Sequence, residues 1–306
     1  MLERIQLHHA DNLEIMKTLS DESVDVICID LPYLYLKNQK LERVFDELKF
    51  FSECKRLLTK DGFIIMFGRG TSFYRWNTIL EYLGYTFKEE IIWNKSYGSS
   101  PLMAITRIHE TISIFSKGNG SISKVKVPYL EMRSFDIGAI KTDVSRINSS
   151  FGNKKHFEAL LKYFNDGEIS FDGDYDSSTT ITSGRKRVNR CISTAQAIID
   201  GMNEKSIIKL KREHYTSIHP TQKPVRLLER LLNLVLPKDK KEIVIADFFA
   251  GSMSCMEAVI NLQNQNPDKT FHGIATEIDE EYFLAGKERI ENKIKTEINL
   301  FNQTVI

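Results

Sequence analysis

The chain has 306 residues, of which 42% are hydrophobic and 27% are charged, as is usual for a globular protein with a substantial core. Its net charge of +1 excludes strong overall attraction to a polyanion, so any contact with nucleic acid must depend on local patches of charge. Four scattered cysteines argue against a zinc site or a disulfide framework, and no apolar run could span a bilayer, which predicts a cytoplasmic protein without a metal.

The first part of the chain alternates between predicted strands and predicted helices. Residues 24–30, VDVICID, form a nearly continuous apolar run, which is typical of a strand covered on both faces. A stop signal, Asp61-Gly62, follows the first long helix. The strands are expected at residues 5–9, 24–30, 62–68, 89–95 and 110–117, and the helices at 43–58 and 76–85. This alternation favours an α/β sheet covered by helices.

The pattern breaks down between residues 118 and 215. This stretch is rich in Gly, Ser, Thr and Asp, and only residues 156–164 favour a short helix. Such a composition predicts a loop-rich insert or a small separate lobe. The insert also contains a basic group that is either a solvated surface or a contact for phosphates: Arg185, Lys186, Arg187 and Arg190.

Regular periodicity returns after His219. Pro224 begins an amphipathic helix, and a second α/β segment follows it to the end of the chain. The expected elements are a helix at 224–236, a strand entering a turn at 242–252, a helix at 254–265, a strand at 270–279 and a final charged helix.

The turn after the strand that starts at residue 242 has the features of a cofactor site. Asp247 ends the strand, and the small residues Ala250, Gly251 and Ser252 allow backbone N–H groups to approach a ligand at a helix start. Glu277 ends the next strand, where an acid can bind ribose hydroxyls. The spacing gives little support to NAD or ATP, and a tight turn without any ligand is the alternative.

Three motifs occur in the order DLPY at 30–33, HPTQKP at 219–224 and DFFAGS at 247–252. In this order they resemble the β group of amino-methylating DNA methyltransferases, and weaker matches support the resemblance in both ordered halves. It implies a catalytic half at 1–117, a target-recognition insert at 118–215 and an S-adenosylmethionine-binding half at 216–306. The implied fold is a doubly wound, mainly parallel, seven-stranded Rossmann-like sheet.

The resemblance also implies roles for the DLPY residues. The adenine amino nitrogen is a poor nucleophile, and two hydrogen-bond acceptors, the Asp30 carboxylate and the Leu31 carbonyl, would draw it towards tetrahedral geometry. Pro32 would hold that carbonyl, and Tyr33 would stack on a base flipped out of double-stranded DNA. Asp30 favours adenine N6 over cytosine N4, because cytosine-N4 enzymes commonly have serine there.

The remaining implied roles concern the cofactor and the DNA. Glu277 would bind the ribose and Asp11 would border the adenine of S-adenosylmethionine. The residues expected to form the rest of the cofactor site are His219, Thr221, Lys223, Asp247, Phe249, Ala250, Gly251 and Ser252. The basic group at 185–190 would contact DNA phosphates. A cognate restriction endonuclease and a homodimer are left open as partners.

Two residues depart from the family pattern. Leu31 stands where the family usually has proline, which should be tolerable because only the backbone carbonyl is needed. Met253 stands where a second glycine usually follows the serine, and it is expected to crowd the methionine portion of the cofactor or to shift the turn. Met253 therefore leaves open an inactive DNA-binding protein of the same fold. Cytosine-N4 methylation by the same scaffold is the other alternative.

Overall fold

The computed structural model describes residues 4–33, 43–98, 104–174, 185–212 and 217–304. The chain divides into two compact units, one formed by Met1–Ser123 with Lys205–Ile306 and the other by Lys124–Glu204. The second unit is shorter than the insert expected at 118–215, because residues 207–209 pair with the sheet of the first unit.

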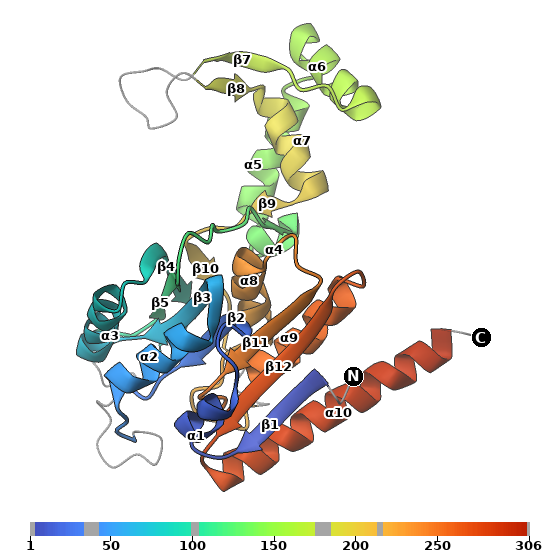
Figure 1. Ribbon diagram of the computed structural model, residues 1–306. Helices are drawn as coiled ribbons and strands as arrows, with labels where there is room; N and C mark the ends of the chain where they lie inside the picture. The colour runs from blue at the N-terminus through green and yellow to red at the C-terminus, as the bar shows by residue number, and fades with distance from the viewer. Residues whose placement is uncertain (1–3, 34–42, 99–103, 175–184, 213–216, 305–306) are drawn as a thin grey trace. The chain divides into compact units, whose positions relative to one another are not determined.

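The first unit is built on an eight-stranded sheet in the order β1-β12-β11-β2-β3-β5-β4-β10 (Figure 1). Neighbouring strands are parallel except at β5, which runs antiparallel to both β3 and β4. The mainly parallel α/β fold is thus confirmed, with β10 as a strand beyond the expected seven. The strands are β1 Ile5–His9, β2 Val24–Asp30, β3 Leu58–Gly68, β4 Thr86–Asn94, β5 His109–Ser116, β10 Ile207–Lys209, β11 Glu242–Asp247 and β12 Thr270–Glu277.

Helices cover both faces of this sheet (Figure 1). One group packs in the order α1, α2, α3, and the other in the order α8, α9, α10. Six of the seven residues of β2 are buried, as expected for a strand with helices on both sides. The helices are α1 Asn12–Thr18, α2 Glu47–Leu57, α3 Gly70–Tyr82, α8 Val225–Val235, α9 Ser254–Gln265 and α10 Glu280–Thr304.

The boundaries of α2 differ from the predicted ones. The helix begins at Glu47 rather than at residue 43, since the Asp46 side chain caps it and accepts a hydrogen bond from the Lys49 N–H at 3.0 Å. It ends at Leu57, and the expected stop lies within β3 instead. Gly62 is needed there because a side chain would come within 3.0 Å of a backbone oxygen of β2.

The third helix begins six residues before its predicted start. Phe73, Trp76 and Leu80 are buried on one face of α3, with the spacing of an amphipathic helix. The residue before the helix, Arg69, makes no side-chain capping bond, so the sequence carries no start signal at this point.

The second unit is more helical than its composition predicts. Its helices are α4 Tyr129–Met132, α5 Ile137–Asn148, α6 Lys154–Asp166 and α7 Arg190–Asp200, and its strand pairs are β6 Lys126–Val127 with β9 Met202–Asn203 and β7 Phe171–Asp174 with β8 Lys186–Val188. Side chains of Asp136, Asn153 and Asn189 cap three of these helices. Polar residues that favour loops in the sequence thus start helices here. In the described part of the chain, no helix is long and apolar enough to cross a membrane.

Candidate active site

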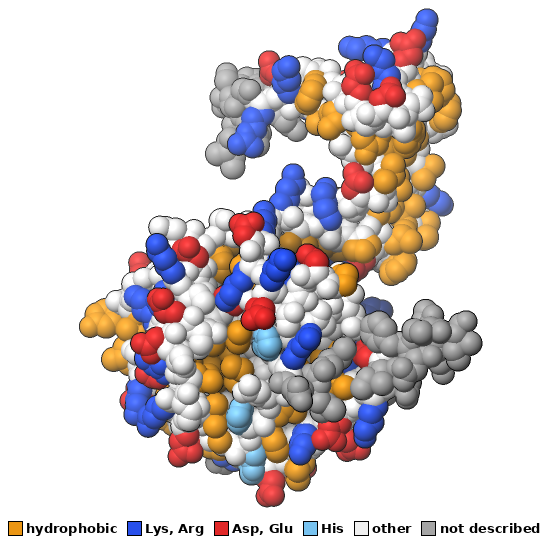
Figure 2. Space-filling model, turned by 45° about the vertical axis from the view of Figure 1, so that its right-hand side comes forward, with side chains coloured by type: hydrophobic (Ala, Val, Ile, Leu, Met, Phe, Trp, Pro, Cys, Tyr) orange, Lys and Arg blue, Asp and Glu red, His pale blue; other side chains and the backbone are white. Residues whose placement is uncertain are grey.

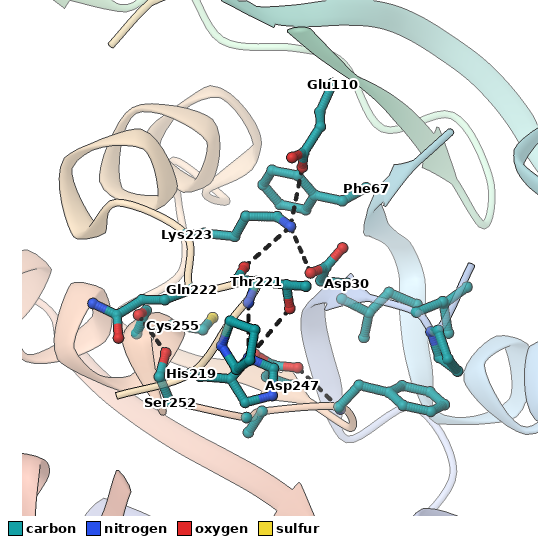
Figure 3. Close-up of a pocket in the computed structure, with 18 of the residues that line it drawn as sticks. Asp30, Phe67, Glu110, His219, Thr221, Gln222, Lys223, Asp247, Ser252 and Cys255 are labelled. Atoms are coloured by element: carbon teal, nitrogen blue, oxygen red, sulfur yellow. Dashed lines mark hydrogen bonds and ion pairs between the residues drawn. The ribbon is translucent and has the colours of Figure 1, made fainter. Parts of the chain in front are cut away.

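Four acidic side chains meet where the strands of the sheet end. Asp30 ends β2, Asp247 ends β11 and Glu277 ends β12, and the carboxyl ends of parallel strands share one edge of a sheet. Glu110, the second residue of β5, joins them because this antiparallel strand starts at that same edge. All four line a cavity of about 470 Å³, a suitable size for a small-molecule ligand. Figure 3 shows part of its lining.

One end of the cavity holds a cluster of two acids and two lysines. The ammonium group of Lys223 lies 2.5 Å from the Asp30 carboxylate and 3.1 Å from that of Glu110 (Figure 3). Lys95 binds the other oxygen of Glu110 at 3.0 Å. The Tyr33 hydroxyl donates to Asp30 at 2.9 Å. The formal charges of the cluster balance, which lowers the cost of burying it.

The two acids of this cluster titrate differently. Burial raises the pKa of Asp30, an effect that the neighbouring Lys223 opposes and the negative charge of Glu110 reinforces. Burial would raise the pKa of Glu110 as well, but two ammonium groups, those of Lys223 and Lys95, lower it to about 2. Burial disfavours the charged form of Lys223, but the two acids outweigh this and raise its pKa. Asp30 is therefore the more basic carboxylate, held beside a permanently charged lysine.

The residues after Asp30 are anchored from both sides. The Leu31 side chain is buried in the hydrophobic core, and the Tyr33 carbonyl accepts a hydrogen bond from the Ser72 hydroxyl at 2.7 Å. The Tyr33 ring lies 6.3 Å from the ring of Trp76. Core packing therefore fixes position 31, where the family pattern has a rigid proline.

The turn between β11 and α9 is held by hydrogen bonds from two acids. The Phe249 N–H donates to Asp247 at 3.1 Å, and the Gly251 N–H donates to Glu277 at 2.9 Å. Gly251 has a φ of 47°, and a side chain there would come within 3.1 Å of the His219 ring. Glycine suits both the left-handed backbone and this close approach.

Asp247 and His219 both favour their neutral forms. Burial raises the pKa of Asp247 to about 8, helped by the negative charges of Asp30 and Glu277 and opposed by the Phe249 N–H. Burial also lowers the pKa of His219 to about 4, and the positive charge of Lys223 adds to this effect. The cavity therefore contains a carboxyl group that a cationic ligand would ionise.

The HPTQKP segment contributes lining residues at both ends of the cavity, Lys223 beside Asp30 and His219 beside Gly251. The His219 ring packs edge-on against Tyr282, with 4.3 Å between ring centroids, and the Thr221 N–H lies 3.3 Å from its Nδ1. Lys223, expected from the sequence to form part of the cofactor site, pairs through its ammonium group with Asp30 and Glu110.

Most of the predicted site residues meet in this one cavity. Those that line it are Asp30, Leu31, Pro32, Tyr33, His219, Thr221, Lys223, Asp247, Phe249, Ala250, Gly251, Ser252 and Glu277. Asp11 is not among them: its side chain caps α1 by accepting from the Leu13 N–H at 2.9 Å.

The predicted DNA-contacting residues belong to the second unit. Arg185, Lys186 and Arg187 lie in and beside β8, Arg190 begins α7, and all four side chains are exposed. Residues 175–184, which precede this basic group, lie outside the described residues.

Met253 does not crowd the cavity, contrary to expectation. It is not a lining residue, and its side chain is fully buried next to Gly286 of α10. The left-handed turn is retained, since Met253 has a φ of 58°. A side chain at this position therefore points away from the ligand side.

Several lining residues have partners that the sequence did not predict. Lys95 and Glu110 come together because β4 and β5 form an antiparallel pair, so the end of one meets the start of the other. A charged residue at each of these strand ends is the only local signal. Arg69, Arg107 and Arg212 also line the cavity. Figure 2 shows one face of the molecule, on which Lys and Arg side chains are interspersed with Asp and Glu side chains.

Comparison with known proteins places these features in a family. A family model described as "DNA methylase" matches residues 24–288. The type II methyltransferase M.HinfI of Haemophilus influenzae is 25% identical over 280 residues, which make up 78% of this chain and 75% of that protein. The fold is also similar to two solved structures. The M1.HpyAVI–SAM complex has a TM-score of 0.51 at 17% identity, covering 93% of this chain and 99% of that one. The cytosine-N4-specific PvuII DNA methyltransferase has a TM-score of 0.51 at 12% identity, covering 97% and 93%.

Proposed function

The chain belongs to the DNA methylase family, and from this membership we propose that it methylates the N6 amino group of adenine in double-stranded DNA. The protein is a DNA methyltransferase, and its methyl donor is S-adenosylmethionine. The adenine specificity and the residue roles that follow are part of the proposal.

The observation that carries the proposal is the carboxylate of Asp30, which lies partly buried at the carboxyl end of β2. The adenine amino nitrogen shares its lone pair with the ring, so it needs hydrogen-bond acceptors that draw the lone pair out. Asp30 is one acceptor and the Leu31 carbonyl is the other. Because burial raises the pKa of Asp30, it is a stronger acceptor than an exposed aspartate. Lys223 and Tyr33 hold this carboxylate in a fixed position.

Bound S-adenosylmethionine supplies an electrophilic methyl group on a positively charged sulfur. As the nitrogen–carbon bond forms and the sulfur–carbon bond breaks, the amino nitrogen must lose a proton. Asp30 is placed to take it, and Lys223 then retains Glu110 as its partner. Tyr33 offers a ring face to the base, which must leave the DNA stack to reach the cavity.

The other end of the cavity fits the donor. The turn at Gly251 exposes backbone to the cavity, and Glu277, at the tip of β12, is in the position where ribose hydroxyls bind in doubly wound folds. Asp247 is a buried carboxyl whose pKa of about 8 leaves it protonated when no cation is near. A cationic ligand at this end would convert it to the carboxylate and gain an ion pair.

The DNA contacts proposed here are of two kinds. The exposed group Arg185, Lys186, Arg187 and Arg190 would bind phosphates without sequence preference. Three arginines that line the cavity, Arg69, Arg107 and Arg212, would bind phosphates next to the flipped nucleotide. A restriction-modification setting belongs to the same proposal, because the similar M.HinfI is a type II methyltransferase.

The second candidate is cytosine-N4 methylation, because the cytosine-N4-specific PvuII enzyme has a similar fold. Asp30 favours adenine, since serine is common at this position in cytosine-N4 enzymes. The deciding experiment is methylation of DNA with radiolabelled S-adenosylmethionine, digestion to nucleosides and chromatography. Label in N6-methyl-2′-deoxyadenosine supports the proposal, label in N4-methyl-2′-deoxycytidine replaces it, and no label despite tight DNA binding identifies an inactive protein.

A further inference from the structure

Met253 lies at the start of α9 in an unusual backbone conformation. With φ 58° and ψ 23° it is in the left-handed region, which a residue with a side chain rarely adopts. Its side chain is fully buried, and its N–H donates to the Ala250 carbonyl at 2.8 Å, which closes the turn. Something other than intrinsic preference must therefore hold this conformation.

The partner of Met253 is Gly286 in α10. A side chain at position 286 would place its Cβ only 2.5 Å from Met253 Cγ and 3.2 Å from the Gly251 carbonyl oxygen. Contacts shorter than 3.0 Å do not occur, and Cγ is too close to the backbone to move aside easily. Because Gly286 has no side chain, it leaves the space that the Met253 side chain occupies.

A second contact from the same helix supports this arrangement. Arg289 lies three residues after Gly286, on a neighbouring position of the same helical face. Its guanidinium donates to the Ser252 carbonyl at 3.3 Å and to the Ser254 hydroxyl at 3.1 Å, and it forms an ion pair with Glu257 at 2.7 Å. Thus α10 contacts the turn at two residues about one helical turn apart, Gly286 and Arg289.

We propose that Gly286 is a positioning residue for S-adenosylmethionine binding. The Met253–Gly286 contact stabilises, at position 253, the left-handed backbone for which the family pattern has a second glycine. The proposal rests on the function proposed above, because the turn is assigned to that cofactor. The contact holds the backbone of Met253 in the left-handed conformation. The Gly251 N–H then stays hydrogen-bonded to Glu277, and the side of the turn that faces the cavity stays free for the cofactor. Cofactor affinity then depends on a helix whose Gly286 does not line the cavity.

The test begins with Gly286→Ala. Alanine favours a helix over glycine, so without the proposed contact this variant should melt at a higher temperature and bind S-adenosylmethionine normally. With the contact, the added methyl group pushes Met253 and the Gly251 carbonyl. The dissociation constant of S-adenosylmethionine in calorimetry should then rise about tenfold, the size of coupling usual between side chains in contact. Glu288→Ala, an exposed change on the same helix, is the matched control and should bind like the wild type.

The double variant Gly286→Ala/Met253→Ala separates positioning from general damage. Alanine at 253 removes Cγ, the atom that the added methyl group would meet at 2.5 Å, so affinity should return to within about threefold of the Met253→Ala single variant. Normal binding by Gly286→Ala, or no recovery in the double variant, overturns the proposal. If Gly286→Ala does not fold, recovery of folding and binding in the double variant supports it equally. Lack of S-adenosylmethionine binding by the wild type would instead contradict the proposed function.

Discussion

Replacing Asp30 with asparagine separates the chemical role of this carboxylate from its structural role. Asparagine keeps the shape and one acceptor oxygen but removes the negative charge. If Asp30 is the acceptor for the adenine amino group, its loss removes a preorganised interaction that is strongest in the transition state. Methyl transfer should fall by about 10²–10³-fold, the usual loss for one such group. Affinity for S-adenosylmethionine should stay near that of the wild type.

The same change should also lower the free energy of unfolding. In Asp30→Asn, the buried Lys223 and its neighbour Lys95 share one acid, Glu110, instead of two. Breaking a buried ion pair costs about 3–5 kcal/mol. The lower end, about 3 kcal/mol, is expected because Lys223 keeps Glu110 and the Asp30 side chain is 18% exposed.

A second substitution distinguishes these two losses. In Asp30→Asn/Lys223→Met the cluster again has equal numbers of charges, with Glu110 and Lys95 remaining, so urea denaturation should show recovery of most of the lost stability. Methyl transfer, measured with tritiated S-adenosylmethionine on DNA, should not recover. Near-normal transfer by folded Asp30→Asn would refute the acceptor role. Recovery of transfer in the double variant would show that stability alone was limiting.

Three further changes test the rest of the site. Glu277→Ala removes the proposed ribose acceptor and the partner of the Gly251 N–H, so it should weaken S-adenosylmethionine binding by about 1–3 kcal/mol in calorimetry. Unchanged affinity would show that Glu277 does not bind the cofactor. Replacing Arg185, Lys186 and Arg187 together by alanine should weaken DNA binding and flatten the plot of log K against log salt, with the cofactor affinity intact; an unchanged slope would assign the group to a solvated surface. The pKa of Asp247 is raised to about 8, and a bound cation lowers it, so cofactor binding below pH 8 releases a proton. The affinity for S-adenosylmethionine should therefore rise with pH, by up to about tenfold per pH unit between about pH 6 and 7.5. Asp247→Asn should abolish this pH dependence, and an equal dependence in that variant would place the titrating group elsewhere.

Local patterns in the sequence predicted the central elements of the sheet well. β2 occupies residues 24–30 and α9 residues 254–265, as their apolar patterns predicted. Most residues of both segments are buried, so burial dictates most of their residue types. The start of α3 was missed because Arg69 offers no capping side chain.

The contacts inside the site are of a different kind. Lys223 and Asp30 lie 193 residues apart, so no local pattern could predict their ion pair. The same holds for Met253, where the sequence shows a missing glycine but not the glycine at 286 that receives its side chain. Sequence motifs identified which residues gather at the cavity, while the partner of each depends on tertiary packing.

The pairing of β11 with β2 has a consequence for how the protein folds. The register joins Ile245 to Val26 in the middle of the sheet, so strands from opposite ends of the chain must meet before the sheet is continuous. Contacts of such long sequence separation form slowly, because closing the intervening loop costs entropy first. On the ribosome, β2 cannot pair with β11 until the residues between them, which include the whole unit at Lys124–Glu204, have been synthesised. That unit is continuous in sequence and emerges earlier than β11, so we expect it to fold before the cavity residues come together.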